Sequence, residues 1–377
     1  MKKVLTGIAY VLYLLVIAEI SLQAFYWVNA GQPLWRRTAS PIFASDPTTG
    51  FWNKRHLDFW QQTNEYSSHI VTNAEGLRVA SPETEYRPGR DPSRYRVLLL
   101  GPSFAFGWGV DYEQSFGHVL ETLLNDSGFA VGKHVEVINA GVPFMSAHQS
   151  FDWYEHGGSA YTPDLVILFA YGSVDVADEY GSERVTVDRA GYLVPRNATR
   201  LDRLRGTVKS SGLAFYAWSV YSRLPVWKGS DAGAAKSIEG AGRTLSSHSG
   251  FSPDGPEVTK SLATFRRGRE LSAAGGARFM VVYFPIAYAV HREDLARWRH
   301  LGAEDVDAQI EYDRQFCDYL TAQGVGCLNI TPDLVSAVRP GKRLYYWLDV
   351  HWTPAGNATA ANAVARRLLA GAIRSRN

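Results

Sequence analysis

The sequence is poor in cysteine: Cys317 and Cys327 are the two in a chain of 377 residues. It has no Cys-x-x-Cys motif and no cluster of histidine with cysteine, the usual signature of a zinc site. The sequence therefore offers no metal motif, and we expect no cofactor. Cys317 falls in a predicted helix and Cys327 in the predicted strand that follows. The two can pair in an oxidising compartment or remain as buried thiols, and the sequence leaves both open.

The sequence also lacks an excess of charge of either sign. Its formal net charge is +2, and 20% of its residues are charged. This balance gives no electrostatic case for binding nucleic acid. We find no internal repeat, and 46% of the residues are hydrophobic, which is enough to bury a core. The aromatic share of 13% suits a core, a membrane interface or a carbohydrate surface, and does not decide between them.

Long apolar stretches are missing except at the N-terminus. There an apolar run extends to residue 28 with Glu19 as its one interruption, and a bilayer needs about 20 such residues in a helix. Lys2 and Lys3 favour a cytoplasmic N-terminus. We therefore predict an uncleaved transmembrane anchor over residues 1–30, in the inner membrane, with the remainder on the periplasmic side. The alternative is a signal peptide cleaved after the sequence Val-Asn-Ala at 28–30.

A carboxyl group within a membrane helix usually interacts with another polar group. We therefore expect Glu19 to face a partner helix.

Three regions follow one another along the chain. An irregular, aromatic-rich lead-in covers residues 31–90, and an α/β domain covers residues 91–377. A segment rich in Gly, Ser and Ala interrupts the domain at about residues 183–256, and we interpret it as a surface insertion. Its first half has a helical pattern and is apolar enough to pack beside the active face.

Within the domain, short apolar segments that predict strands alternate with amphipathic segments that predict helices. Strands that are apolar throughout are typical of a parallel sheet covered on both faces. Thr353 and Pro354 are typical of the first residues of a helix, which would be the last one in the chain. The fold class is therefore α/β, a three-layer α/β/α sandwich with a mostly parallel sheet, preceded by one transmembrane helix. The predicted strands have the sequences YRVLLLG, VEVINAG, DLVILFAYG, RFMVVYFP and GVGCLNI.

Candidate catalytic residues fall where predicted strands end. Ser103 follows the first strand, whereas Asp349 and His351 come just before the last helix. In parallel sheets, ligands bind at the carboxyl ends of the strands. Ser103 is therefore the candidate nucleophile, His351 its base, and Asp349 the group that orients the imidazole. The backbone N–H groups of Ser103 and Gly141 are candidate donors to an oxyanion.

The motifs around these residues resemble the SGNH/GDSL hydrolase superfamily, whose fold is flavodoxin-like. Gly101-Pro102-Ser103 is similar to its Gly-Asp-Ser block, Gly141 to its second block, and "YGSVDVAD" lies where its Gly-x-Asn-Asp block belongs. "DVHWTPAGN" is similar to the last block, and "TNAEGLR" to a lead-in of membrane-anchored members. The resemblance spans roughly residues 70–370.

Three departures from the family pattern stand out. Pro102 replaces the usual aspartate, and Val174 stands where the oxyanion-hole asparagine is expected. Losing one such donor costs about 3–4 kcal/mol of transition-state stabilisation, unless Ser173 or water replaces it. The spacing of Asp349 and His351 resembles polysaccharide O-acetyltransferases of the alginate type more than plain esterases.

The resemblance implies a serine esterase or O-acyltransferase that forms an acyl-Ser103 intermediate. Its implied substrate is an acylated carbohydrate, most simply an acetylated envelope or extracellular polysaccharide, and its implied partner is a membrane O-acyltransferase. Pro102 and Val174 support an alternative: a catalytically degenerate subunit that binds or assembles within a membrane complex. An enzyme acting on membrane lipids is a third reading, weakened because the sequence has no long apolar lid.

Overall fold

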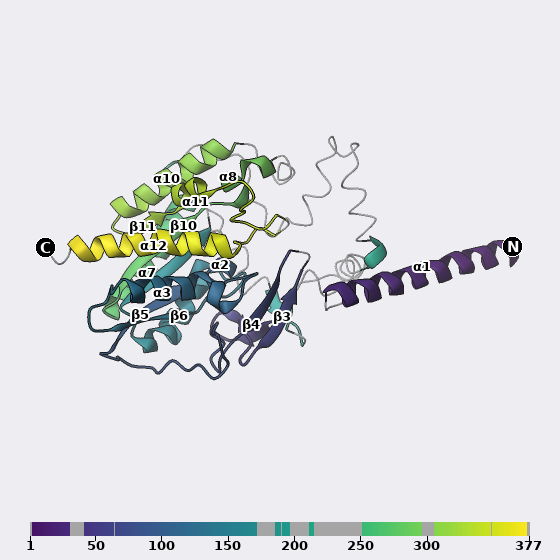
Figure 1. The fold of residues 1–377 in the computed structure, drawn as a ribbon, viewed down its shortest axis with the longest axis horizontal. Coiled ribbons are helices and arrows are strands. Elements are labelled where there is room, and N and C mark those ends of the chain that lie inside the picture. The colour runs from purple at the N-terminus through teal and green to yellow at the C-terminus, as the bar shows by residue number, and fades with distance from the viewer. Residues whose placement is uncertain are drawn as a thin grey trace.

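The computed structural model describes residues 2–30, 41–63, 65–171, 185–189, 191–196, 211–214, 251–295, 305–347 and 349–374. At the centre is a parallel sheet of five strands, in the order β11-β10-β7-β5-β6 (Figure 1). All five strands expected from the sequence are confirmed. They are β5 (Arg94–Leu100), β6 (His134–Asn139), β7 (Leu165–Tyr171), β10 (Arg278–Phe284) and β11 (Cys327–Asn329).

Helices cover both faces of this sheet, so the predicted three-layer sandwich is confirmed. Alternate residues of β5 show why: Leu98 and Leu100 pack into one hydrophobic cluster, and Val97 and Leu99 into the other. The first cluster is closed by α4 (Ala147–His156), α7 (Pro256–Ala274) and α10 (Val306–Ala322). The second is closed by α3 (Phe116–Asp126), α11 (Thr331–Ala337) and α12 (Pro354–Arg374). Shorter helical segments are α2 (Ser103–Phe106), η2 (Tyr112–Gln114), η3 (Gly158–Tyr161), α8 (Ala287–Val290) and η7 (Arg292–Asp294).

The lead-in has regular structure of its own. It forms two antiparallel hairpins, β1 (Phe43–Asp46) with β2 (Gly50–Asn53), and β3 (Asp58–Gln62) with β4 (Ser67–Val71). Buried Arg78 ties the second hairpin to the domain: its guanidinium donates to the carbonyls of His69, Val71 and Val110. The lead-in therefore packs as part of the domain.

The predicted insertion lies largely outside the described residues. Its described parts are the hairpin of β8 (Val185–Val187) with β9 (Leu193–Pro195) and the segment 211–214. Regular structure resumes at 256 with α7, as the sequence pattern predicted.

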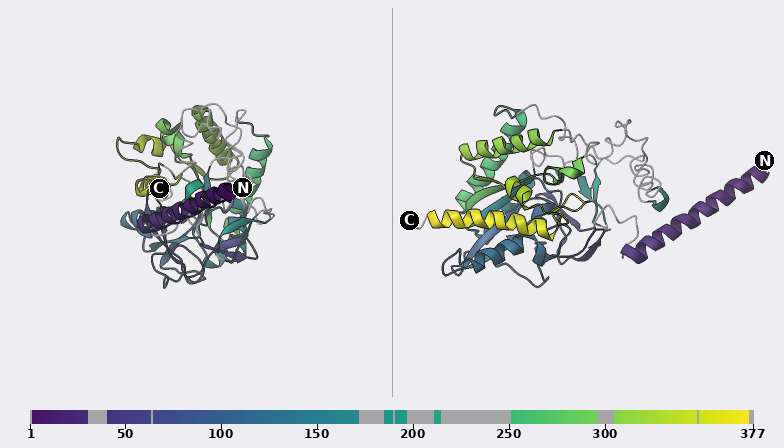
Figure 2. Two further views of the ribbon diagram at one scale, coloured as in Figure 1. Left: turned by 90° about the vertical axis from the view of Figure 1, so that its right-hand side faces the viewer. Right: turned by 45° about the horizontal axis from the view of Figure 1, so that its top comes forward.

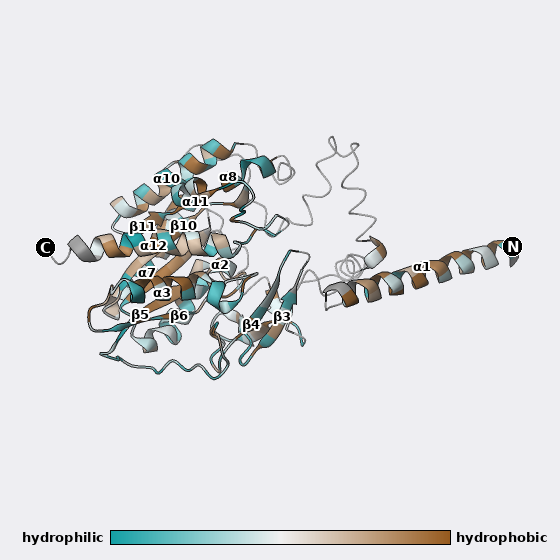
Figure 3. Cartoon of the chain, in the orientation of Figure 1, coloured by the Kyte–Doolittle hydropathy of each residue, from teal (hydrophilic) through white to brown (hydrophobic). Residues whose placement is uncertain are grey.

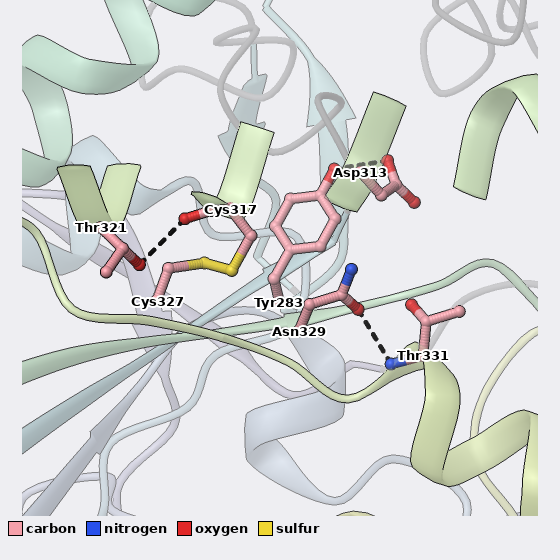
Figure 4. Close-up of a disulfide and its surroundings, with 7 residues drawn as sticks. All are labelled: Tyr283, Asp313, Cys317, Thr321, Cys327, Asn329 and Thr331. Carbon is pink, nitrogen blue, oxygen red and sulfur yellow. Dashed lines mark hydrogen bonds between the residues drawn. A yellow bond between two sulfur atoms is a disulfide. The ribbon is translucent and has the colours of Figure 1, made fainter. Parts of the chain in front are cut away.

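Cys317 and Cys327 form a disulfide, which settles the question that the sequence left open (Figure 4). The bond joins α10 to β11, the strand at one edge of the sheet. One helical turn before Cys317, the buried side chain of Asp313 accepts hydrogen bonds from Tyr283 on β10 and from Gln309. The disulfide and the hydrogen bond from Tyr283 to Asp313 both hold α10 against the sheet.

The N-terminal helix α1 (Lys2–Ala30) projects from the domain (Figures 1 and 2). Within it, Lys3–Phe25 is long and apolar enough to cross a membrane, and its apolar surface is open to the surroundings (Figure 3). A signal sequence would satisfy the same test of length and composition.

Candidate active site

Ser103 stands at a sharp turn between strand β5 and the short helix α2. Gly101 makes this turn possible, because its φ is +131° and a Cβ there would lie 2.9 Å from the Cβ of Phe169. Pro102 follows, and Ser103 is the first residue of α2. The turn places the hydroxyl at the carboxyl end of the sheet, where ligands of parallel sheets bind.

His351 and Asp349 reach the same place from the loop before α12. Ser103 Oγ lies 2.6 Å from His351 Nε2, and the opposite ring nitrogen, Nδ1, is hydrogen-bonded to Asp349 Oδ1. Thr353 caps the helix that follows, with its Oγ1 accepting from the N–H of Gly356 at 3.2 Å. The three predicted catalytic side chains, 248 residues apart at their extremes, thus form one continuous chain of hydrogen bonds.

Aromatic side chains enclose the imidazole. The ring of Phe104, next to the serine, lies 4.9 Å from the ring of His351, and Trp108 lies 6.0 Å from it. Phe104 in turn packs against Trp352. Packing on several sides fixes the orientation of the imidazole and keeps water from its faces.

Two residues of the lead-in hold the acid, and the sequence reasoning missed both. Tyr66 Oη donates to Asp349 Oδ2 at 2.7 Å. The carboxylate of Glu65 accepts from the N–H groups of Trp347 and Asp349, at 2.6 and 2.8 Å. Nothing in the local pattern marks Glu65 or Tyr66, because their partners lie more than 280 residues away.

These contacts set the charge of the acid. Burial raises the pKa of Asp349, but the charge of His351 and hydrogen bonds from His351 and Tyr66 outweigh it and lower the pKa to about 2. Burial, followed by the neighbouring Asp349 charge, raises the pKa of Tyr66 far above its usual range. Tyr66 therefore remains an O–H donor while Asp349 remains an anion.

The two candidate oxyanion donors, the backbone N–H groups of Ser103 and Gly141, differ in whether they already donate a hydrogen bond. Ser103 begins α2, and among the described residues no acceptor takes its N–H. The N–H of Gly141 instead donates to Asn139 Oδ1 at 3.0 Å. Gly141 can serve an oxyanion only if this bond is shared or exchanged. Ser173 and Val174 lie outside the described residues.

The described residues contain no group of three or more His, Cys, Asp or Glu side chains placed to hold a metal ion.

The C-terminal third of the chain matches a known family. Residues 247–376 match the model described as the SGNH hydrolase-like domain of the acetyltransferase AlgX. This part of the chain is similar to an SGNH hydrolase-like domain. The matched residues include Asp349 and His351.

No curated protein matches the chain. Solved structures similar to it include the acetyl xylan esterase AlAXEase, with 13% identity, 72% of this chain and 98% of that chain covered, and a TM-score of 0.38. A catalytic mutant of Axe2, an acetylxylan esterase from Geobacillus stearothermophilus, shares 12% identity over 73% of this chain and 94% of its own, with a TM-score of 0.37. A lipase/acylhydrolase from Enterococcus faecalis shares 13% identity over 74% and 96%, with a TM-score of 0.36.

Proposed function

We propose that this protein is a membrane-anchored serine esterase or O-acyltransferase that works through an acyl-Ser103 intermediate. The observation that carries the proposal is the hydrogen-bonded chain Ser103–His351–Asp349, with 2.6 Å between the hydroxyl oxygen and the imidazole. A serine, a histidine and a half-buried carboxylate, hydrogen-bonded in this order, can carry out acyl transfer.

The proposed reaction has two halves. Ser103 Oγ attacks the acyl carbonyl carbon while His351 Nε2 takes the hydroxyl proton, and Asp349 stabilises the imidazolium that forms. The tetrahedral intermediate collapses, the C–O bond to the alcohol breaks, and His351 returns the proton to the departing oxygen. In the second half, His351 deprotonates water or a sugar hydroxyl, which takes the acyl group and releases Ser103.

The proposed substrate is an acetylated polysaccharide of the envelope or cell exterior. The match to the domain of an acetyltransferase supports acetyl as the acyl group. Trp347, two residues before Asp349, is 52% exposed, and tryptophan is a side chain on which sugar rings can stack. A membrane O-acyltransferase that supplies the acyl group is the partner that fits this scheme.

A second candidate function is a non-catalytic subunit that binds or assembles within a membrane complex. The observation in its favour is the engaged N–H of Gly141, which removes one oxyanion donor from the resting site. Val174 in place of asparagine points the same way. The aligned triad favours the enzyme.

Labelling with a fluorophosphonate probe tests the proposal on the full chain in detergent. The enzyme predicts labelling of the wild type, and loss of labelling in Ser103→Ala and His351→Ala. Ser115→Ala is a matched control, because Ser115 is a buried serine whose hydroxyl donates to the carbonyl of Tyr112, away from the triad. A wild type that fails to react while a known serine esterase reacts in the same tube supports the non-catalytic subunit.

A further inference from the structure

One face of the membrane helix contacts the rest of the chain. Side chains from 3 to 17 are exposed, whereas Ala18, Glu19, Leu22 and Gln23 are covered to varying degrees. Ala18 and Leu22 are one helical turn apart, as are Glu19 and Gln23, so the four side chains share one face of α1. The contact is therefore a short stripe near the end of the helix that leads to the domain.

Glu19 is the centre of this contact. Its carboxylate accepts from Ser211 Oγ at 2.8 Å, from the N–H of Gly212 at 2.7 Å and from the N–H of Leu213 at 2.9 Å. Gln23 adds a fourth hydrogen bond from one turn along α1, at 2.7 Å. The sequence led us to expect that Glu19 would face a partner helix, and its partners prove to include a segment of the same chain.

The position of Glu19 in the helix places this contact inside the membrane. The candidate span is Lys3–Phe25, and Glu19 is six residues before its end. At 1.5 Å per residue, that is about 9 Å along the helix axis. A segment bonded to Glu19 therefore lies at a depth where water is scarce.

The two segments satisfy each other's polar groups. A carboxylate and open N–H groups are each costly in lipid, where no water can replace a missing partner. Glu19 takes two of the open N–H groups of residues 211–214, and Ser211 Oγ takes a third, that of Ala214, at 3.2 Å. Either segment alone would leave polar groups unpaired in the lipid, at a higher cost in free energy.

We propose that residues 211–214 enter the membrane beside α1, held by Glu19, and contact its lipid. The insertion of the α/β domain thereby gains a second attachment to the bilayer besides the covalent link through α1. It follows that α1 is retained, because cleavage after residue 30 would remove the partner of this segment. This inference is independent of the proposed enzymatic activity.

Site-directed thiol labelling tests the proposal. Both native cysteines are in the disulfide, so an introduced cysteine is the only free thiol. Leu213→Cys and Val131→Cys are compared in membranes made leaky by freezing, with a membrane-impermeant maleimide. Val131 is 74% exposed on the α/β domain, and Leu213 is half-buried in the chain itself, so water would reach both if lipid did not intervene.

We expect the thiol of Leu213→Cys to escape labelling in membranes and to react in SDS, while that of Val131→Cys reacts in both. Adding Glu19→Ala should expose the thiol at 213. The control Tyr10→Ala, on the exposed part of α1, should not. Limited proteolysis reports whether the domain stays folded in each variant. Equal labelling of the two thiols in the native background, or protection that survives Glu19→Ala, overturns the proposal.

Discussion

Tyr66 is the residue outside the proposed triad that does most to lower the pKa of Asp349. Its hydroxyl is one of the groups that lower the pKa of Asp349 to about 2. A hydrogen bond to a charged group contributes about 1.5–3 kcal/mol. Without it, the carboxylate of Asp349 is less stabilised and takes up a proton at higher pH, and a protonated Asp349 no longer stabilises the imidazolium that forms when Ser103 reacts.

We therefore predict that Tyr66→Phe raises the pKa of Asp349 by about 1–2 units from its value of about 2 and lowers kcat/KM, because the imidazole loses part of its support. The measurement is kcat/KM for an activated acetyl ester between pH 3 and 9, where the loss should grow toward the acid end. Tyr346→Phe is the matched control: Tyr346 lies against Tyr66 but donates to the carbonyl of Gly109 instead of Asp349. Identical profiles for Tyr66→Phe and the wild type would show that the contact has no role in orienting the acid.

Asp313 is a second residue whose protonation should affect a measurable property, here the stability of the fold. Burial raises its pKa to about 7 against the opposing hydrogen bonds from Tyr283 (Figure 4) and from Gln309. A raised pKa means that the folded state holds a proton that the unfolded state releases. This contribution to stability is complete below about pH 4, declines as pH rises, and is gone above about pH 7.

Asp313→Asn keeps the size of the side chain and removes its titration. We predict that this variant matches the wild type near pH 4 and is more stable at pH 8, by on the order of 2–4 kcal/mol. Thermal unfolding of both proteins across this range is the check. A difference that is the same at every pH would mean that Asp313 does not titrate with folding.

Among the elements, α2 is placed by its close approach to the loop after β6. A Cβ on Gly141 would lie 2.3 Å from the backbone nitrogen of Phe106, so α2 packs directly on the glycine. Asn139 strengthens this junction by donating to the carbonyl of Ala105. The orientation of Ser103 therefore depends on β6 as well as on β5.

Gly141→Ala should force α2 and this loop apart. We predict a loss of about 1–3 kcal/mol in unfolding free energy and a loss of reactivity at Ser103, measured by denaturant unfolding and probe labelling. The control is Gly371→Ala on α12, where an added Cβ meets no atom within 4 Å. Full stability and reactivity in Gly141→Ala would rule out this dependence.

The sequence predicted the sheet well and the supports of the site poorly, for a physical reason. Strands such as 97–100 are apolar throughout, and that signal is local. Gly101, Ser103 and His351 were found because each sits in a short motif at a strand or helix end. Glu65 and Tyr66 act through hydrogen bonds to a loop that only folding brings near, and a single sequence contains no record of such pairs.

Across the whole molecule, the anchor limits where the site can be. Residues 31–42 join α1 to β1, and 12 residues span at most about 40 Å when fully extended. The carboxyl end of the sheet, with the triad, faces the α1 side of the domain (Figures 1 and 2). With α1 as the proposed membrane anchor, the proposed site would be held near the membrane, which suits a substrate or acyl donor that arrives there.

A retained α1 makes a further prediction. The chain should stay in the membrane pellet after an alkaline carbonate wash and should be released by detergent, because 23 residues of the helix match the thickness of a bilayer. Sequencing the N-terminus of the purified protein provides the second check. Release into the wash, together with an N-terminus that begins after residue 30, would identify α1 as a cleaved signal peptide.

The central claim is that Ser103 carries the acyl group, and trapping that intermediate tests it most directly. The full chain in detergent is mixed with an activated acetyl ester, quenched in acid within the first turnover, digested and analysed by mass spectrometry. The account predicts one acetyl group on the peptide that contains Ser103, and none in Ser103→Ala. An acetyl group on another residue, or turnover that continues in Ser103→Ala, would contradict it.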